Sequence, residues 1–190
     1  MILAIDVANT NSKIGFYLNG TWLHRWQVRT QRNRTTDEYG IIMRSLLSQS
    51  DIDPADVAIP IVSSVVPPVT SNLKEMLVSM FDRPPLIVQP GVKTGIRIRT
   101  DNPSEVGSDL VAGAVAAYER YNSGCIIVGF GTALSFTAVA EPGDLLGVAI
   151  APGLNYASEA LFQHTAQLRL VDLSLPDTAI GKNTQHSIQS

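Results

Sequence analysis

The chain has 190 residues, of which 45% are hydrophobic and 16% charged, and its formal net charge at pH 7 is −3. This composition supports a folded core in one large or two small domains, and the lack of a basic excess argues against a nucleic-acid partner. The single cysteine, Cys125, excludes an intramolecular disulfide. No apolar run is long enough for a signal peptide or a membrane span, so we expect a cytoplasmic protein with no membrane partner.

The chain opens with two short apolar runs, 2–7 and 14–18, separated by a turn of small polar residues. This pattern predicts a β-hairpin. Asp6 interrupts the first run, and a buried carboxylate is costly unless a partner or a cation neutralises it. Small residues in the turn would let backbone N–H groups approach a phosphate. The residues alone leave two interpretations open, a nucleotide-binding turn and an ordinary Asn-rich turn.

Strands and helices alternate over the next part of the chain. Residues 21–30 alternate as a third strand, and Thr35 and Glu38 have the spacing of a helix capping box. The helix that follows would bury one apolar face, formed by Ile41, Ile42, Leu46 and Leu47. A strand at 57–66, a helix beginning at Pro67 and a short strand at 86–88 come next. This order favours a partly parallel sheet covered by helices.

A half-exposed strand is expected at 96–100, followed by a helix over 104–121 with Asn102 as its N-cap. The apolar side of this helix would be formed by Val106, Leu110, Val111, Ala114, Val115 and Tyr118. Asp109 falls on another side, near Ala112 and Gly113 at helical spacing. These small residues leave room for a ligand or for a neighbouring helix, and the spacing alone favours helix packing with Asp109 exposed.

The opening hairpin is repeated later in the chain. Residues 125–136 again form an apolar strand, a small-residue turn and a return strand, with Gly129 at the position of Asp6 and Gly131 at that of Ala8. A third strand at 145–151 and a helix at 154–168 follow, with Ala157, Ala160 and Leu161 expected to face inward. Two similar turns from duplicated halves would clamp a nucleotide between them.

Other chemistry finds little support in the sequence. There is no P-loop, no complete G-x-G-x-x-G, no G-x-S-x-G and no histidine spacing that would bind a metal. Asn183 or Thr184 could cap a helix that has barely one turn before Ser190. Because so short a helix cannot bury a face, we expect either a truncated chain or a partner at this end.

Taken together, the motifs resemble the type III pantothenate kinases of the actin-like, acetate-and-sugar-kinase superfamily. Residues 5–11 resemble the D-x-G-N-T-N phosphate motif, 107–110 the G-x-D-R motif, and 130–133 part of the D-F-G-T-A motif. Residues 149–153 and 181–184 are similar to segments of the family's second domain. The resemblance implies an α/β fold of two duplicated ribonuclease H-like halves, each a mixed sheet covered by helices. We place these halves at 1–113 and 114–190, the second incomplete.

The resemblance also implies an activity and its site. The family phosphorylates pantothenate with ATP, the first step towards coenzyme A, as a cytoplasmic homodimer that uses Mg²⁺ and a monovalent cation (K⁺ or NH₄⁺). Asp109 would be the general base. The ATP-binding residues would be Asp6, Val7, Ala8, Asn9, Thr10, Asn11, Ser12, Lys13 and Thr132. The pantothenate-binding residues would be Thr100, Gly107, Ser108, Asp109, Leu110 and Thr184.

Several positions depart from the family pattern. Ala8 and Val148 replace glycines, Leu110 replaces the substrate-binding arginine, and Thr100 stands where a tyrosine is common. Gly129 replaces the aspartate that binds the monovalent cation, so that ligand is missing. Two functions therefore remain: a pantothenate kinase, or a catalytically impaired paralogue that binds a nucleotide or a protein partner.

Overall fold

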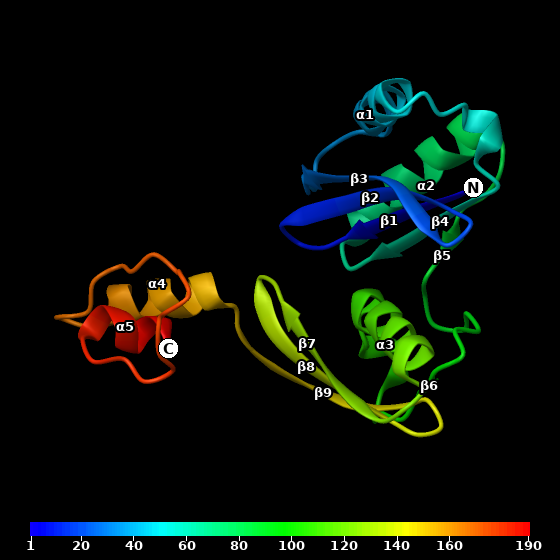
Figure 1. Cartoon of the computed structure of the whole chain (residues 1–190). Helices are drawn as coiled ribbons and strands as arrows, with labels where there is room; N and C mark the ends of the chain where they lie inside the picture. Colours follow the sequence, from blue (N-terminus) through cyan, green and yellow to red (C-terminus); the bar gives the residue numbers. More distant parts are fainter.

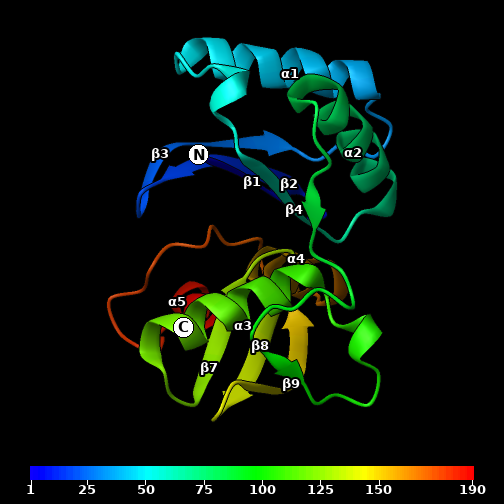
Figure 2. The same ribbon diagram turned by 90° about the vertical axis from the view of Figure 1, so that its right-hand side faces the viewer.

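The computed structural model describes residues 1–190 as two β-sheets with a helix between them (Figures 1 and 2). The first sheet has the order β3-β2-β1-β4-β5. Its strands are β1 (Ile2–Val7), β2 (Asn11–Leu18), β3 (Thr21–Arg29), β4 (Ile59–Ser64) and β5 (Leu86–Ile87). β1, β2 and β3 pair antiparallel with one another, and β4 and β5 run parallel to β1. The predicted opening hairpin and partly parallel sheet are confirmed.

Helices α1 (Thr36–Gln49) and α2 (Pro67–Phe81) lie on the same face of the first sheet (Figure 2). The capping box of Thr35 and Glu38 is present, and α2 begins at Pro67 as predicted. Leu3, Ile5 and Val7 point into this layer as part of a core of 17 buried residues. The predicted apolar face of α1 is wrong at Ile41, which is 62% exposed, because the helix turns Tyr39 and Met43 inward instead.

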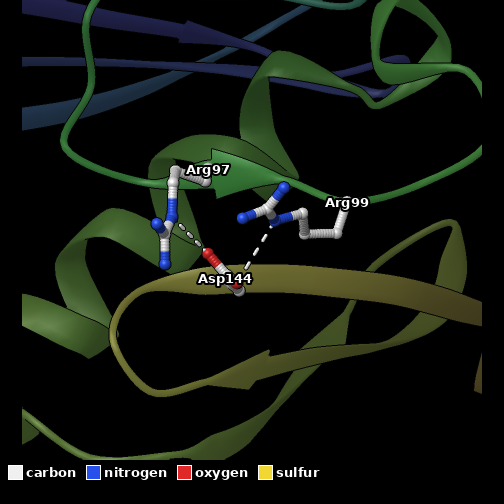
Figure 3. A network of polar contacts seen from close by, with 3 residues as sticks. All are labelled: Arg97, Arg99 and Asp144. Atoms are coloured by element: carbon white, nitrogen blue, oxygen red, sulfur yellow. Dashed lines mark hydrogen bonds and ion pairs between the residues drawn. The ribbon is translucent and has the colours of Figure 1, made fainter.

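Strand β6 (Arg97–Ile98) leads into the second sheet and is shorter than the sequence predicts. It runs parallel to β9 (Asp144–Pro152) at the edge of that sheet. The Nε atoms of Arg97 and Arg99 lie 2.6 Å and 3.2 Å from the two carboxylate oxygens of Asp144 (Figure 3). Desolvation raises the pKa of Asp144, but the hydrogen bonds and charges of the two arginines outweigh it and leave the pKa below 3.8. This pairing fastens the segment before the central helix to the second sheet.

Helix α3 (Ser108–Tyr121) lies between the two sheets (Figure 2). It begins four residues later than predicted, because Asn102 caps a separate 3₁₀ turn at Pro103–Glu105 and Gly107 is the N-cap of α3. Of its predicted apolar side, Val111 and Ala114 are buried, and Ala114 packs with Val139 and Leu145 of the second sheet. The helix runs without a break across residues 113 and 114, where we place the division between the halves.

The second sheet has the order β6-β9-β8-β7, with β7 (Cys125–Phe130) and β8 (Ala133–Ala140) forming the repeated hairpin. The antiparallel order β9-β8-β7 repeats β3-β2-β1. The turn is one residue shorter in the second copy: Asp6 pairs with Lys13, whereas Gly129 pairs with Ser135. The duplication is therefore present in topology and differs in the turn.

The two copies also differ in what covers them. Ile126, Val128 and Phe130 take the places of Leu3, Ile5 and Val7, yet they are 63%, 43% and 73% exposed. Helices α4 (Leu154–His164) and α5 (Thr184–Gln189) lie beyond the end of the second sheet rather than over this face (Figure 1). The predicted inward residues of α4 are wrong at Ala160 and at Leu161, which is 42% exposed, because the helix buries only Ser158. No helix in the structure is both long enough and apolar enough to cross a membrane.

Candidate active site

Asp6 lies on the face of the first sheet that α1 and α2 do not cover. Alternation along β1 turns Leu3, Ile5 and Val7 into the core and Asp6 to the opposite face. Its cross-strand neighbours are Lys13 on β2 and Ser63 on β4, and the Ser63 hydroxyl donates a hydrogen bond of 3.3 Å to Asp6 Oδ1. The two neighbouring strands thus supply the polar partners that the Asp6 carboxylate requires.

The surroundings of Asp6 raise the pKa of its carboxyl. Burial raises the pKa of this carboxyl above 3.8, the hydrogen bond from Ser63 lowers it, and the nearby charge of Asp109 raises it again. Lys13 contributes a smaller lowering. A carboxyl group with these neighbours is suited to meet a cation, which would remove the repulsion from Asp109.

The first turn of α3 is fixed to strand β4 through serine hydroxyls. The backbone N–H of Ser64 donates to Ser108 Oγ at 2.9 Å, and Ser63 Oγ donates to the same atom at 3.2 Å. The Ser108 hydroxyl in turn donates to the Ser64 carbonyl at 3.1 Å. Ser63 is a functional candidate that the sequence analysis does not name. A polar pair within a buried strand was the available signal.

Asp109 and Asp6 line one cavity of about 780 Å³ between the first sheet and α3. Ala112 and Gly113 line the same cavity, so the small residues of α3 face open space rather than another helix, which overturns the expectation of helix packing. A Cβ on Gly107 would lie 2.5 Å from Asp109 Oδ1, so a side chain at this position would displace the Asp109 carboxylate. The same oxygen accepts a hydrogen bond of 2.9 Å from the N–H of Leu110.

The two hairpin turns meet at a second cavity of about 570 Å³. Thr10 Oγ1 and Thr132 Oγ1 are 2.7 Å apart and share a hydrogen bond across it. Gly153 closes the back of the β7–β8 turn, where its N–H donates to the Thr132 carbonyl at 3.1 Å. A Cβ on Gly153 would collide with the backbone of Gly131 and Thr132.

Other predicted nucleotide-binding residues belong to the same first turn. Asn11 lines the second cavity with Thr10, and Ala8 donates its N–H to the Asn11 carbonyl at 3.2 Å. Asn9 is exposed, whereas Val7 is buried in the core. The buried Ser12 shares a hydrogen bond of 2.8 Å with Thr30, so its side chain points away from the Asp6 face.

Of the predicted substrate residues, only Asp109 lines either cavity; the others are Thr100, Gly107, Ser108, Leu110 and Thr184. Gly107 and Ser108 line a third cavity of about 690 Å³ together with Ser64. The Thr100 hydroxyl is buried without a hydrogen-bond partner. Thr184 is the first residue of α5 and lines a separate cavity with Arg169, Asp172 and Asn183. Within this single chain, the structure therefore groups Asp109 with Asp6, Lys13 and Ser63, and not with Thr184.

The possible metal ligands of the site are the carboxylates of Asp6 and Asp109. No cluster of three or more His, Cys, Asp or Glu side chains exists in the chain. Mg²⁺ is commonly held by one or two carboxylates together with substrate phosphates, and the pair of Asp6 and Asp109 on one cavity fits that pattern. Gly129 offers no side-chain ligand for a monovalent cation, and the space beside it is occupied by Ser135 Oγ.

Comparison with known proteins decides the family. Residues 2–190 match the sequence model of the type III pantothenate kinase family. The chain belongs to this family. The type III pantothenate kinase of Myxococcus xanthus is 48% identical over all 190 residues, which cover 74% of that protein. The enzyme of Anaeromyxobacter sp. (strain Fw109-5) is also 48% identical, with 75% of its length covered.

Solved structures resemble this chain in fold alone. A Baf family transcriptional activator from Campylobacter jejuni matches 98% of this chain and 71% of its own, with a TM-score of 0.52 and 16% identity. A 2-dehydro-3-deoxygalactonokinase from Sinorhizobium meliloti matches 87% of this chain and 57% of its own, with a TM-score of 0.51 and 12% identity. The predicted actin-like α/β class is confirmed.

Proposed function

We propose that this chain transfers the γ-phosphoryl group of ATP to the primary hydroxyl of pantothenate, the reaction named by its family. The observation that carries the proposal is the joint placement of Asp6 and Asp109 on one cavity, beside the meeting point of two duplicated hairpin turns. Phosphoryl transfer depends mainly on positioning and on charge stabilisation, and this arrangement offers both.

The turns would hold the phosphates of ATP. Thr10, Asn11, Gly131 and Thr132 line the cavity where the turns meet, and small residues there let backbone N–H groups face an anion. Lys13 faces the Asp6 side and would neutralise phosphate charge as the transition state develops. Ala8, Asn9 and Ser12 would contribute mainly through the turn's backbone.

Asp109 would accept the proton of the pantothenate hydroxyl as that oxygen attacks phosphorus. Asp109 is exposed and sits in the first turn of α3, which Ser108 fixes to strand β4. A general base must lie within hydrogen-bond reach of the proton that it removes, so a fixed helix end is a suitable support. Gly107 leaves the space that the Asp109 carboxylate occupies.

The metal partners of the reaction follow from the donor set. Asp6 would hold the Mg²⁺ that arrives with the nucleotide, and this ion would neutralise charge on the phosphates, which leaves Asp109 free to accept the proton. The residues at Gly129 do not fit a monovalent cation, so we assign no step to one. The remaining substrate residues, Thr100, Leu110 and Thr184, are proposed contacts from the family resemblance alone.

We further propose that the protein works in the cytoplasm as a homodimer, with α3 in the contact region. The two halves at 1–113 and 114–190 likewise stay a prediction. Sedimentation at micromolar concentration tests the dimer, because a single species with the 20.5 kDa mass of the chain would contradict it.

The direct test of the function is product identification. The purified chain is incubated with Mg²⁺, γ-labelled ATP and pantothenate, and the label is sought in 4′-phosphopantothenate by mass spectrometry. Reactions without pantothenate report hydrolysis of ATP by itself. Label in phosphopantothenate supports the proposal, whereas label in inorganic phosphate alone, with or without pantothenate, would contradict it.

A further inference from the structure

Polar and small residues form two parallel rows on the Asp6 face of the first sheet. The first row crosses four strands as Gln27, Lys13, Asp6 and Ser63, as the strand register shows. The second row lies two residues further along the strands and reads Arg25, Gly15, Ala4 and Ile61. All eight residues line the cavity that also holds Asp109. The cavity is therefore polar along one row and mostly apolar along the other. It holds two cations, Lys13 beside Asp6 and Arg25 at its far edge.

Of these two cations, Arg25 is the one that lies away from the carboxylates. It is exposed, and its side chain forms no hydrogen bond. It also forms no ion pair, since the chain's two ion pairs both involve Asp144. The carboxylates of the cavity, Asp6 and Asp109, lie at its other end. Strand spacings place the Cα atoms of Arg25 and Asp6 ~12 Å apart, two strands across and two residues along. A guanidinium in this position matches a planar anionic group such as a carboxylate.

Small apolar residues line the cavity between these ends. Its floor is Ala4 and Gly15, and the ring of Trp22 lies so close over Gly15 that a Cβ there would be 2.6 Å from Cζ3. Ala112 and Gly113 of α3 form the opposite wall, and a Cβ on Gly113 would meet no atom within 4 Å. Such a slot suits a short aliphatic chain rather than a bulky ring.

We infer that Arg25 binds the carboxylate of the acceptor and thereby selects an anionic acceptor whose hydroxyl reaches Asp109. This inference rests on the proposed function. Pantothenate carries its carboxylate eight bonds from the primary hydroxyl oxygen, which is ~9 Å when extended by the rise of an extended chain. With the reach of the Arg25 side chain, this length covers the ~12 Å between the Cα atoms of Arg25 and Asp6. The methyl groups of the acceptor would contact Ala4 and Ala112, which line the cavity.

The chain has a built-in reporter for this test. Its two tryptophans, Trp22 and Trp26, both line the cavity, so ligand binding there should change the intrinsic fluorescence without any turnover. Wild type, Arg25→Gln and Arg25→Lys are titrated with pantothenate and with pantothenol, in which a hydroxyl replaces the carboxylate. Arg44→Gln is the matched control, because Arg44 is an exposed arginine of α1 and lies outside this cavity.

We expect Arg25→Gln to weaken pantothenate binding about tenfold or more, since a hydrogen-bonded charge pair is lost. Pantothenol binding should be equal in wild type and in Arg25→Gln, Arg25→Lys should recover part of the pantothenate affinity, and Arg44→Gln should resemble wild type. Under turnover the change should appear in KM for pantothenate, with kcat nearly constant. Equal losses for both ligands, or no loss for either, would overturn the assignment of Arg25 and leave the kinase function standing. If wild type binds neither ligand, the proposed function itself fails, and the assignment with it.

Discussion

Thr10 and Thr132 share a hydrogen bond of 2.7 Å, although 122 residues separate them in the sequence. Each lies in the turn of one copy of the repeated hairpin, so the contact joins the two halves at the cavity assigned to the phosphates. The duplication seen in the sequence therefore has a direct structural consequence: it brings two small-residue turns together.

Removing either hydroxyl should weaken ATP binding. We expect Thr10→Ala and Thr132→Ala each to raise the Kd for ATP by about twofold to tenfold, the range of one hydrogen bond. Because the two hydroxyls contact each other, the double variant should lose less than the sum of the free energies lost by the single variants. Calorimetric titration of the four proteins with ATP measures this coupling. Strict additivity would show that the two turns bind the nucleotide independently.

Asp6→Asn should separate stability from function. The pKa of Asp6 is 3.8 in the unfolded chain and higher in the folded chain. At a pH between these two pKa values, the folded chain therefore binds more protons than the unfolded chain. The contribution of Asp6 to the free energy of unfolding therefore falls as pH rises through that window. An asparagine avoids this loss and still accepts from Ser63. We expect Asp6→Asn to be at least as stable as wild type at pH 8, with activity greatly reduced.

Urea unfolding of wild type and Asp6→Asn at pH 3.5 and pH 8 checks the sign. The stability of the variant relative to wild type should be greater at pH 8 than at pH 3.5. A variant that loses stability relative to wild type as the pH rises would show that Asp6 is stabilised as a carboxylate in the fold.

Gly153→Ala should damage the second turn without touching a reactive group. The new methyl group would collide with the backbone of Gly131 and Thr132, which cannot move as a flexible side chain can. We expect a destabilisation of about 1–3 kcal/mol, the cost of overpacking, and weaker ATP binding. Gly113→Ala is the control because its methyl group enters open space in a helix, where alanine is favoured by about 1 kcal/mol. Thermal unfolding of both variants separates the outcomes, and equal melting temperatures would contradict the packing argument.

Because Gly129 replaces the aspartate that binds the monovalent cation in the family, we predict slow turnover that does not depend on potassium. Electrostatic groups aimed at developing charge are worth ~3 kcal/mol, or on the order of a hundredfold in rate. Gly129→Asp should introduce potassium dependence, but its Cβ would lie 2.6 Å from Ser135 Oγ, so the double variant with Ser135→Ala should respond more strongly. Adding Leu110→Arg should raise the rate further if that position contacts the substrate. Rates with and without potassium decide the matter, and robust potassium-dependent turnover by the unchanged chain would refute the prediction.

Local signals predicted much of this fold. The capping box at Thr35, the proline start of α2 and the repeated hairpin were all found from the sequence, because each depends on neighbours close in the chain. The start of α3 was misplaced because Asn102 and Pro103 cap a 3₁₀ turn as well as they would cap an α-helix. Periodicity also failed at Leu161, since it shows which face of a helix is apolar but not whether any layer covers that face.

The candidate site was only partly predictable for a related reason. Asp6 and Asp109 were identified by their motifs, but their approach across the cavity depends on how α3 lies between the sheets. Ser63 becomes a candidate only when the parallel pairing of β4 with β1 sets it beside Asp6. Arg25 joins the site through the register of β2 and β3, which no local pattern fixes.

The most direct test of the account compares phosphopantothenate formation by wild type and by Asp109→Asn, with Glu105→Gln as the matched control from the exposed 3₁₀ turn that precedes α3. ATP binding is measured in all three proteins. We predict that wild type and Glu105→Gln form the product at similar, slow rates. Asp109→Asn should bind ATP normally and be slower by about 10²–10⁴-fold, the usual contribution of a general base. An Asp109→Asn rate equal to wild type would contradict the assigned base, and no product from wild type despite normal binding of ATP and pantothenate would contradict the kinase itself.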